Sequence, residues 1–110
     1  MKVNKELLKG STATMLLALL KEKDRYGYEI IKEIEKKSEG VFVMKEGTLY
    51  PILHLLENDG LLASFWSEQE GRKRKYYKIT DEGRAQLAEK QREWMHFRTA
   101  VDKVLGEGAL

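Results

Sequence analysis

Residues 60–80 read GLLASFWSEQEGRKRKYYKIT, and this stretch decides the fold. Leu61 to Ser67 is rich in large apolar residues, and Lys73 to Ile79 alternates with a two-residue period. The polar segment from Glu68 to Arg72 lies between them and contains a glycine. Two strand-like runs joined by a short, glycine-containing loop predict a β-hairpin.

Two helices are predicted before residue 41. The first runs from about Lys5 to Lys21, and the second follows Asp24, which can cap it, and ends at Ser38 to Gly40. Residues at three- and four-residue steps give each helix an apolar face, with Leu8, Thr12, Met15, Leu16, Leu19 and Leu20 in the first and Tyr26, Ile30, Ile31 and Ile34 in the second.

A third helix is predicted to begin near Gly47 and Thr48, with Pro51 in its first turn, where a missing N–H does little harm. It stops at Asn58-Asp59-Gly60, and Gly60 suits a left-handed C-cap. Its apolar side is expected to consist of Leu49, Ile52, Leu53, Leu55 and Leu56.

A long helix is expected after the hairpin. Thr80 can cap it, and it runs to about Leu105 before Gly106 ends it, which makes it about 36 Å long. The predicted fold class is therefore mainly α with a small β-hairpin, in the order of a winged helix-turn-helix. We expect residues 1–80 to form the DNA-binding domain and residues 81–110 to form a C-terminal dimerisation helix.

The composition excludes several classes of protein. The 110 residues fit one domain, and the absence of cysteine rules out disulfides and thiol catalysis. His54 and His96 are too few for a convincing zinc site, and no catalytic triad or phosphate loop is present, so we expect no metal, no cofactor and no enzyme activity. The apolar run Met15 to Leu20 is too short for a membrane span, and no secretory signal precedes it, which predicts a cytoplasmic protein.

A cluster of positive charge stands out against a net charge of only +2. Four consecutive basic residues follow Gly71 at the tip of the predicted hairpin, and a basic wing can neutralise DNA phosphates. A solvated edge that prevents strand pairing is the alternative. We interpret these residues as DNA contacts: Arg72, Lys73, Arg74 and Lys75.

The start of the third helix is the predicted reader of double-stranded DNA, because a helix fits the major groove and its N-terminal residues reach bases and phosphates. Lys45, Thr48 and Tyr50 offer an ammonium group and two hydroxyls there. The alternative, that Thr48 caps the helix while Tyr50 packs, is equally consistent with the sequence. His54 is expected on the polar face of this helix, toward solvent or phosphate.

The last helix carries apolar residues at heptad spacing, which is typical of a helix that pairs with a second chain. Leu87, Trp94 and Val101 are seven apart, as are Phe97 and Val104, and we expect all five at a homodimer interface. A helix that folds back onto its own domain is the alternative. From the sequence alone, packing is the simpler role for Trp94, and a flat wall for a planar ligand is the other.

Four segments together resemble the PadR family of bacterial transcriptional regulators: Tyr26–Ile30 (YGYEI), Glu46–Pro51 (EGTLYP), Leu56–Leu61 (LENDGL) and Gly71–Gly83 (GRKRKYYKITDEG). The resemblance implies a dimeric winged-helix repressor in which Tyr28, Thr48, Tyr50 and the basic wing meet DNA. The single C-terminal helix looks like that of the small subfamily, which includes multidrug-sensing repressors. Trp94 lies where those proteins hold flat compounds, so the resemblance implies a planar aromatic effector.

Two other functions stay open. One is a ligand sensor with a secondary DNA role, and the other is a winged helix used for protein–protein assembly. Steep loss of duplex binding with salt would favour the regulator over the assembly module.

Overall fold

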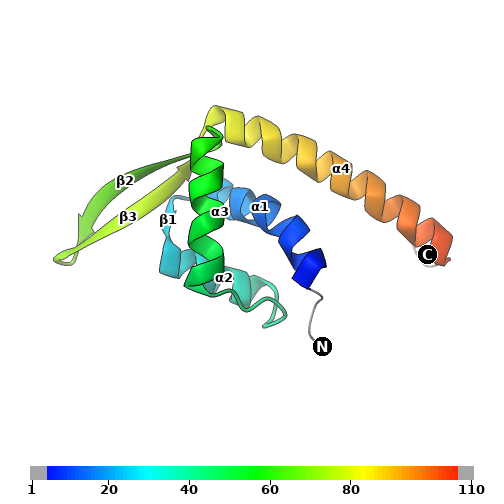
Figure 1. Ribbon diagram of the computed structural model, residues 1–110, viewed down its shortest axis with the longest axis horizontal. Coiled ribbons are helices and arrows are strands. Elements are labelled where there is room, and N and C mark those ends of the chain that lie inside the picture. Colours follow the sequence, from blue (N-terminus) through cyan, green and yellow to red (C-terminus); the bar gives the residue numbers. More distant parts are fainter. Residues whose placement is uncertain (1–4, 107–110) are drawn as a thin grey trace.

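The computed structural model describes the backbone of residues 5–106 and the side chains of residues 11–106. The described residues form four helices and three strands (Figure 1). This arrangement confirms the predicted winged helix-turn-helix with a long C-terminal helix. The elements are α1 (Lys5–Glu22), β1 (Arg25–Tyr26), α2 (Gly27–Lys37), α3 (Glu46–Asn58), β2 (Leu62–Gln69), β3 (Arg72–Ile79) and α4 (Asp81–Leu105).

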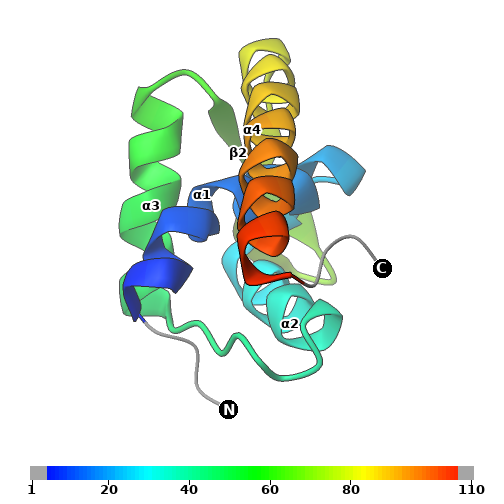
Figure 2. The ribbon, with the colours of Figure 1, turned by 90° about the vertical axis from the view of Figure 1, so that its right-hand side faces the viewer.

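Helix α1 lies at the centre of the body, and α2, α3 and α4 surround it (Figure 2). Its leucines fill the core because the helix contacts neighbours on several sides. Of the expected apolar face, Thr12, Leu16, Leu19 and Leu20 are buried, Met15 is half-buried, and Leu8 lies outside the described side chains. Leu17 is also buried, although the three- and four-residue steps did not include it. The buried core comprises Leu16, Leu17, Leu19, Leu20, Ile30, Ile34, Met44, Leu49, Leu53, Leu56, Leu62, Tyr77, Ile79 and Leu87.

The hairpin belongs to a three-stranded antiparallel sheet in the order β1-β3-β2. Strand β1 was not predicted, because its two residues carry no periodic signal. The hairpin turn is also tighter than expected: Glu70 and Gly71 alone connect the strands, with φ of 53° and 74°. Positive φ at both central residues is the geometry of a type I′ turn, which matches the twist of paired strands. The predicted loop from Glu68 to Arg72 is therefore too long.

The start of α2 differs from the prediction. Arg25 and Tyr26 pair with β3 before the helix begins, so Tyr26 replaces Asp24 as the N-cap residue. The Tyr26 N–H donates to Glu29 Oε1 at 3.2 Å.

The start of α3 also lies earlier than expected. Lys45 is the N-cap residue, so the interpretation of Thr48 as a cap is wrong. Pro51 consequently lies inside the helix, beyond its first turn, where it cannot donate to the carbonyl one turn before it. Leu55 is 58% exposed and does not join the apolar side of α3.

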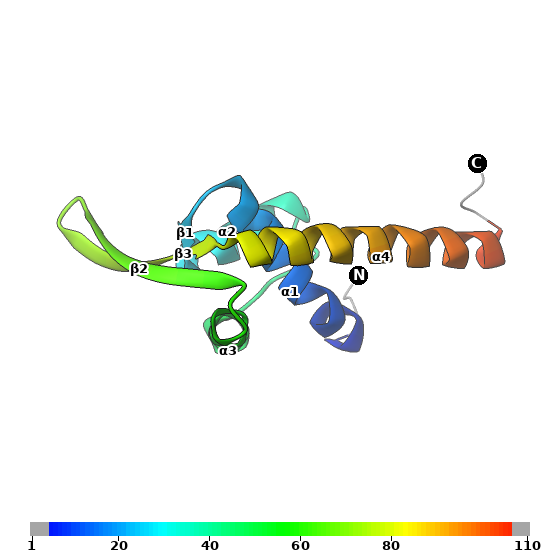
Figure 3. The same cartoon turned by 90° about the horizontal axis from the view of Figure 1, so that it is seen from above.

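Helix α4 begins as predicted, because Thr80 Oγ1 accepts a hydrogen bond from the Gly83 N–H at 3.0 Å. Gly83 and Leu87 are buried, but from residue 88 to residue 106 no residue is buried. The hairpin and α4 project from opposite sides of the helical body (Figure 3). Across residues 5–106, none of the helices combines the length and apolar character needed to cross a membrane.

Candidate nucleic-acid interface

Helix α3 presents one face to the core and the other to solvent. Leu49, Leu53 and Leu56 are buried, which leaves Lys45, Thr48 and His54 exposed on the remaining surface. Tyr28 lies at the start of α2 and is 54% exposed. The Nζ atom of Lys32 lies 5.3 Å from the centre of the Tyr28 ring. The predicted reader residues Tyr28, Lys45 and Thr48 are therefore all accessible to a large ligand.

Tyr50 behaves differently, because its side chain turns toward the start of α2. A Cβ placed on Gly27 would lie 2.2 Å from the Tyr50 hydroxyl oxygen and 2.7 Å from Cζ. Since those distances are far below van der Waals contact, Gly27 leaves the space that the Tyr50 ring occupies. The ring is half-buried, and its centre lies 6.4 Å from that of His54.

The register of the hairpin divides the basic run between its two faces. Lys75 pairs with Trp66 and shares its face with Lys73 and the buried Tyr77, because side chains alternate along a strand. Arg72 and Arg74 share the opposite face with Tyr76. The basic run therefore does not lie on a single face of the hairpin, as its treatment as one cluster implied.

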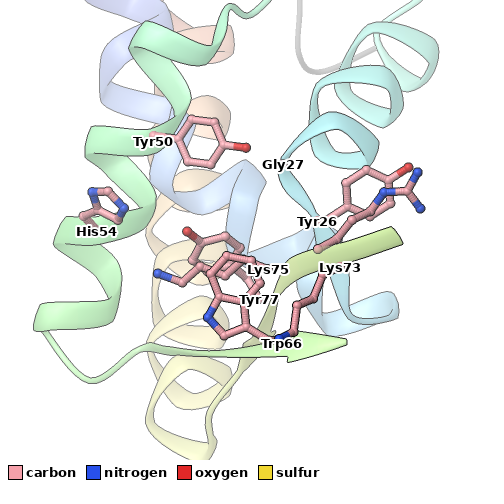
Figure 4. A pocket seen from close by; sticks show the side chains of 9 residues that line it. Tyr26, Gly27, Tyr50, His54, Trp66, Lys73, Lys75 and Tyr77 are labelled. Carbon is pink, nitrogen blue, oxygen red and sulfur yellow. The ribbon is translucent and has the colours of Figure 1, made fainter. Parts of the chain in front are cut away.

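A groove of about 380 Å³ lies between α3 and the hairpin. Figure 4 shows Tyr50 and His54 on α3, with Trp66, Lys73, Lys75 and Tyr77 on the hairpin. None of the described residues that line the groove is Asp or Glu. It is therefore a cationic groove with aromatic walls, and we call it the α3–wing groove. Its lining consists of Tyr26, Gly27, Tyr50, His54, Trp66, Lys73, Arg74, Lys75 and Tyr77.

Trp66 is a site residue that the sequence interpretation missed. It is 64% exposed although it lies in the apolar strand β2. Because side chains alternate along a strand, Trp66 lies on the same face as the buried Leu62 but further toward the tip of the hairpin, where the core no longer covers it. This position in the strand could have identified Trp66 from the sequence. A large exposed aromatic side chain between two lysines marks a binding surface.

Tyr77, which lines the groove, is almost fully buried. Burial raises the pKa of the Tyr77 hydroxyl, and the nearby carboxylate of Glu57 adds to the effect. Glu57 itself accepts a hydrogen bond from Ser64 Oγ. Tyr77 therefore keeps its proton at neutral pH and remains a hydrogen-bond donor.

Helix α4 carries the remaining predicted site residues. Trp94 and Phe97 are 50% and 58% exposed, and their ring centres lie 6.2 Å apart. Val101 and Val104 continue this exposed apolar surface toward the C-terminus. Leu87 does not belong to it: only 1% of Leu87 is exposed, so this side chain is already used by the core and has no surface left for a partner.

No group of three or more His, Asp or Glu side chains that could hold a metal ion occurs in the part of the chain that the structure describes. The two histidines lie apart on different helices, with His96 exposed on α4.

These features define a winged-helix protein of the kind that regulates transcription. Residues 16–89 match the family described as the transcriptional regulator PadR-like family. The chain therefore belongs to the PadR-like family of transcriptional regulators, in its small single-domain form. The family consists of regulators, which confirms the prediction that the protein is not an enzyme.

Individual relatives agree with this assignment. A transcriptional regulator from Clostridium thermocellum has a similar structure, with a TM-score of 0.84 and 38% identity over 90% of this chain and 97% of the relative. A PadR family regulator from Clostridium difficile has a TM-score of 0.79 and 36% identity, over 86% of this chain and 98% of the relative. Transcriptional regulator Rv3488 of Mycobacterium tuberculosis is 40% identical over 74 residues, which cover 67% of this chain and 56% of Rv3488.

Proposed function

We propose that the protein is a homodimeric repressor that binds an operator in double-stranded DNA through α3 and the wing. The α3–wing groove carries this proposal. A reading helix in the major groove and a wing in the neighbouring minor groove must straddle the sugar-phosphate strand between them. A groove between these two elements, lined by lysines and no described carboxylate, suits that strand.

Each side chain then has a distinct role. Lys73 and Lys75 face the groove and neutralise phosphates, while Arg72 extends the positive charge at the tip of the wing. Tyr28, Lys45 and Thr48 are exposed and can donate to phosphates or base edges. The Tyr50 hydroxyl lies at the back of the groove, where it can reach a phosphate that has entered it.

The exposed part of α4 supports pairing of two chains. Residues 81–110 would form the pairing unit and residues 1–80 the DNA-binding unit, although Gly83 and Leu87 also anchor α4 in the core. A stripe of Trp94, Phe97, Val101 and Val104 is too apolar to be left to solvent on an isolated helix. Paired helices would set two reading helices about 34 Å apart, as half-sites one helical turn apart require.

Trp94 is the proposed wall for an effector. Half of the residue is exposed, and Phe97 lies beside it, so a planar aromatic compound could stack there between two chains. A ligand that separates or rotates the α4 helices would change the spacing of the reading helices and release the operator. This mechanism needs no cofactor, and it places the protein in the cytoplasm, where its DNA target lies.

Binding to a duplex recovered by selection from a random library tests DNA recognition. Thr48→Ala should weaken binding to that duplex without lowering the thermal unfolding midpoint, because Thr48 is exposed and does not cap α3. If no duplex is selected, or if binding does not weaken with rising salt, the assembly module is the better assignment.

Light scattering tests the dimer. Phe97→Asp should produce monomers, because it introduces a charge within the proposed interface. His96→Asp is the matched control: it adds the same charge to the neighbouring exposed position of α4 and should leave the dimer intact. Equal behaviour of the two variants would contradict pairing through this stripe.

A further inference from the structure

Arg74 lies in the lining of the α3–wing groove, where its guanidinium group covers the Tyr26 ring. Its guanidinium carbon lies 4.5 Å from the centre of the Tyr26 ring. The Tyr26 ring meets Tyr76 edge-on with 5.4 Å between centres, and Tyr76 stacks on Phe65 at 5.7 Å. Arg74 therefore covers one end of a row of three rings on the outer face of the sheet. A planar guanidinium suits such a position better than an ammonium does.

This row connects the wing to the helix-turn-helix. Tyr26 ends β1 and is also the N-cap residue of α2. The pair Tyr26↔Tyr76 is the last β1–β3 pair toward the tip. Closer to the tip, residues Lys75 to Arg72 of β3 pair with β2 and not with β1. The hairpin projects beyond the body (Figure 3). Arg74 thus ties this projecting part to the body at the point where backbone pairing with β1 has ended.

We propose that Arg74 is a positioning residue that holds the wing at its angle to α3, and that it does not contact DNA phosphate. The proposal rests on the wing's proposed role in DNA binding. Lys73 and Lys75, on the opposite face, supply the phosphate contacts. The Arg74 guanidinium covers the Tyr26 ring, and its side chain leaves β3 on the face opposite to Lys73 and Lys75.

The test compares Arg74→Gln with Lys73→Gln, because both remove one positive charge from adjacent positions of β3. Both are made in a Trp94→Phe background, so that Trp66 on the wing is the one tryptophan left. The probe is a selected duplex of about 30 base pairs, long enough for two half-sites. Duplex affinity is measured across a salt series, and Trp66 fluorescence anisotropy is measured without DNA.

Arg74→Gln should weaken binding about three- to tenfold, as expected for loss of a cation–π contact that orders the wing. The slope of log affinity against log salt should not change, while the anisotropy of Trp66 should fall because the wing moves more freely. Lys73→Gln should show the converse: a slope flatter by about two units, one for each protomer of the bound dimer, and an unchanged anisotropy.

Tyr26→Leu provides a second variant that keeps the Arg74 charge. It should reproduce the loss of anisotropy and the unchanged salt slope, and combining it with Arg74→Gln should add little. A salt slope for Arg74→Gln that falls as in Lys73→Gln, or an unchanged Trp66 anisotropy, overturns the assignment. If Lys73→Gln also leaves the slope unchanged, the proposed DNA-binding groove itself is wrong, and this outcome is distinguishable from failure of the Arg74 role alone.

Discussion

Gly27→Ala should destabilise the protein through a clash with Tyr50. The new methyl carbon would lie 2.2 Å from the Tyr50 hydroxyl oxygen, 2.7 Å from Cζ and 3.2 Å from Cε1. Ordinary contact needs about 3.5 Å, so the ring must retreat by about 1 Å. Tyr50 is half-buried, so a ring that retreats into the α3–wing groove loses packing against the start of α2. Overpacking of this kind costs about 1–3 kcal/mol, and the helical gain of Ala over Gly offsets part of it.

The net loss should be about 1–2 kcal/mol in the free energy of unfolding. For a chain of this size, that corresponds to a thermal midpoint lower by about 4–8 °C per kcal/mol, measured by circular dichroism at fixed protein concentration. Gly47→Ala is the matched control, because a Cβ there meets nothing within 4 Å. It should be neutral or slightly stabilising, as for an exposed helical glycine.

A double-mutant cycle locates the clash. Tyr50→Leu removes the hydroxyl and Cζ that the Gly27→Ala methyl would meet, so the two changes together should cost less than the sum of their separate costs. A Gly27→Ala protein with the wild-type midpoint, or fully additive costs, would show that Tyr50 does not depend on the space at Gly27.

Three further changes probe the packing and charge of the fold. Leu87→Ala should lower the free energy of unfolding by about 2–5 kcal/mol in urea titrations, because Leu87 is a core residue; a near-zero change would return it to the dimer surface. Thr80→Ala should cost about 1 kcal/mol, because Thr80 caps α4 and its hydroxyl donates to the Gly60 carbonyl at 2.7 Å, whereas Thr80→Ser should retain most of the stability. The hydrogen bond from Lys37 to Glu22, with the charges of Lys37 and Arg25, lowers the pKa of Glu22. The ionised Glu22 carboxylate therefore stabilises the fold at neutral pH, and this contribution is lost as the pH falls through the lowered pKa. In urea titrations, Glu22→Gln should accordingly lose less stability on acidification than the wild type does. Equal losses in the two proteins would mean that this ion pair does not contribute.

The sequence predicted the elements better than their junctions. Periodicity identified most of the buried positions of α1, α2 and α3, because burial of a helix repeats every three to four residues. It wrongly included Leu55, which is exposed, and omitted Leu17, which is buried. It missed β1, whose two residues form a strand only because β3 lies beside them. The same pairing moved the α2 cap from Asp24 to Tyr26, a tertiary effect that local capping preferences do not contain.

The sequence predicted which residue types form the candidate site more successfully than it predicted the face on which each side chain lies. The basic run was correctly assigned to a hairpin, but its division between two faces depends on the register and on the tight turn at Glu70 and Gly71. Leu87 fits the heptad spacing of α4 as well as Trp94 does, and spacing alone cannot show that the core covers the first turns of this helix. Trp66 was missed because an aromatic residue in a strand is ordinarily assigned to the core.

The salt dependence of duplex binding by Lys73→Gln/Lys75→Gln tests the central claim most directly. Both lysines line the α3–wing groove, which we propose holds a DNA strand. The double variant should bind selected and random duplexes more weakly, with a slope of log affinity against log salt flatter by about four units than that of the wild type, two for each protomer of the bound dimer. A slope equal to the wild-type value would contradict the claim that this groove is where the protein holds DNA.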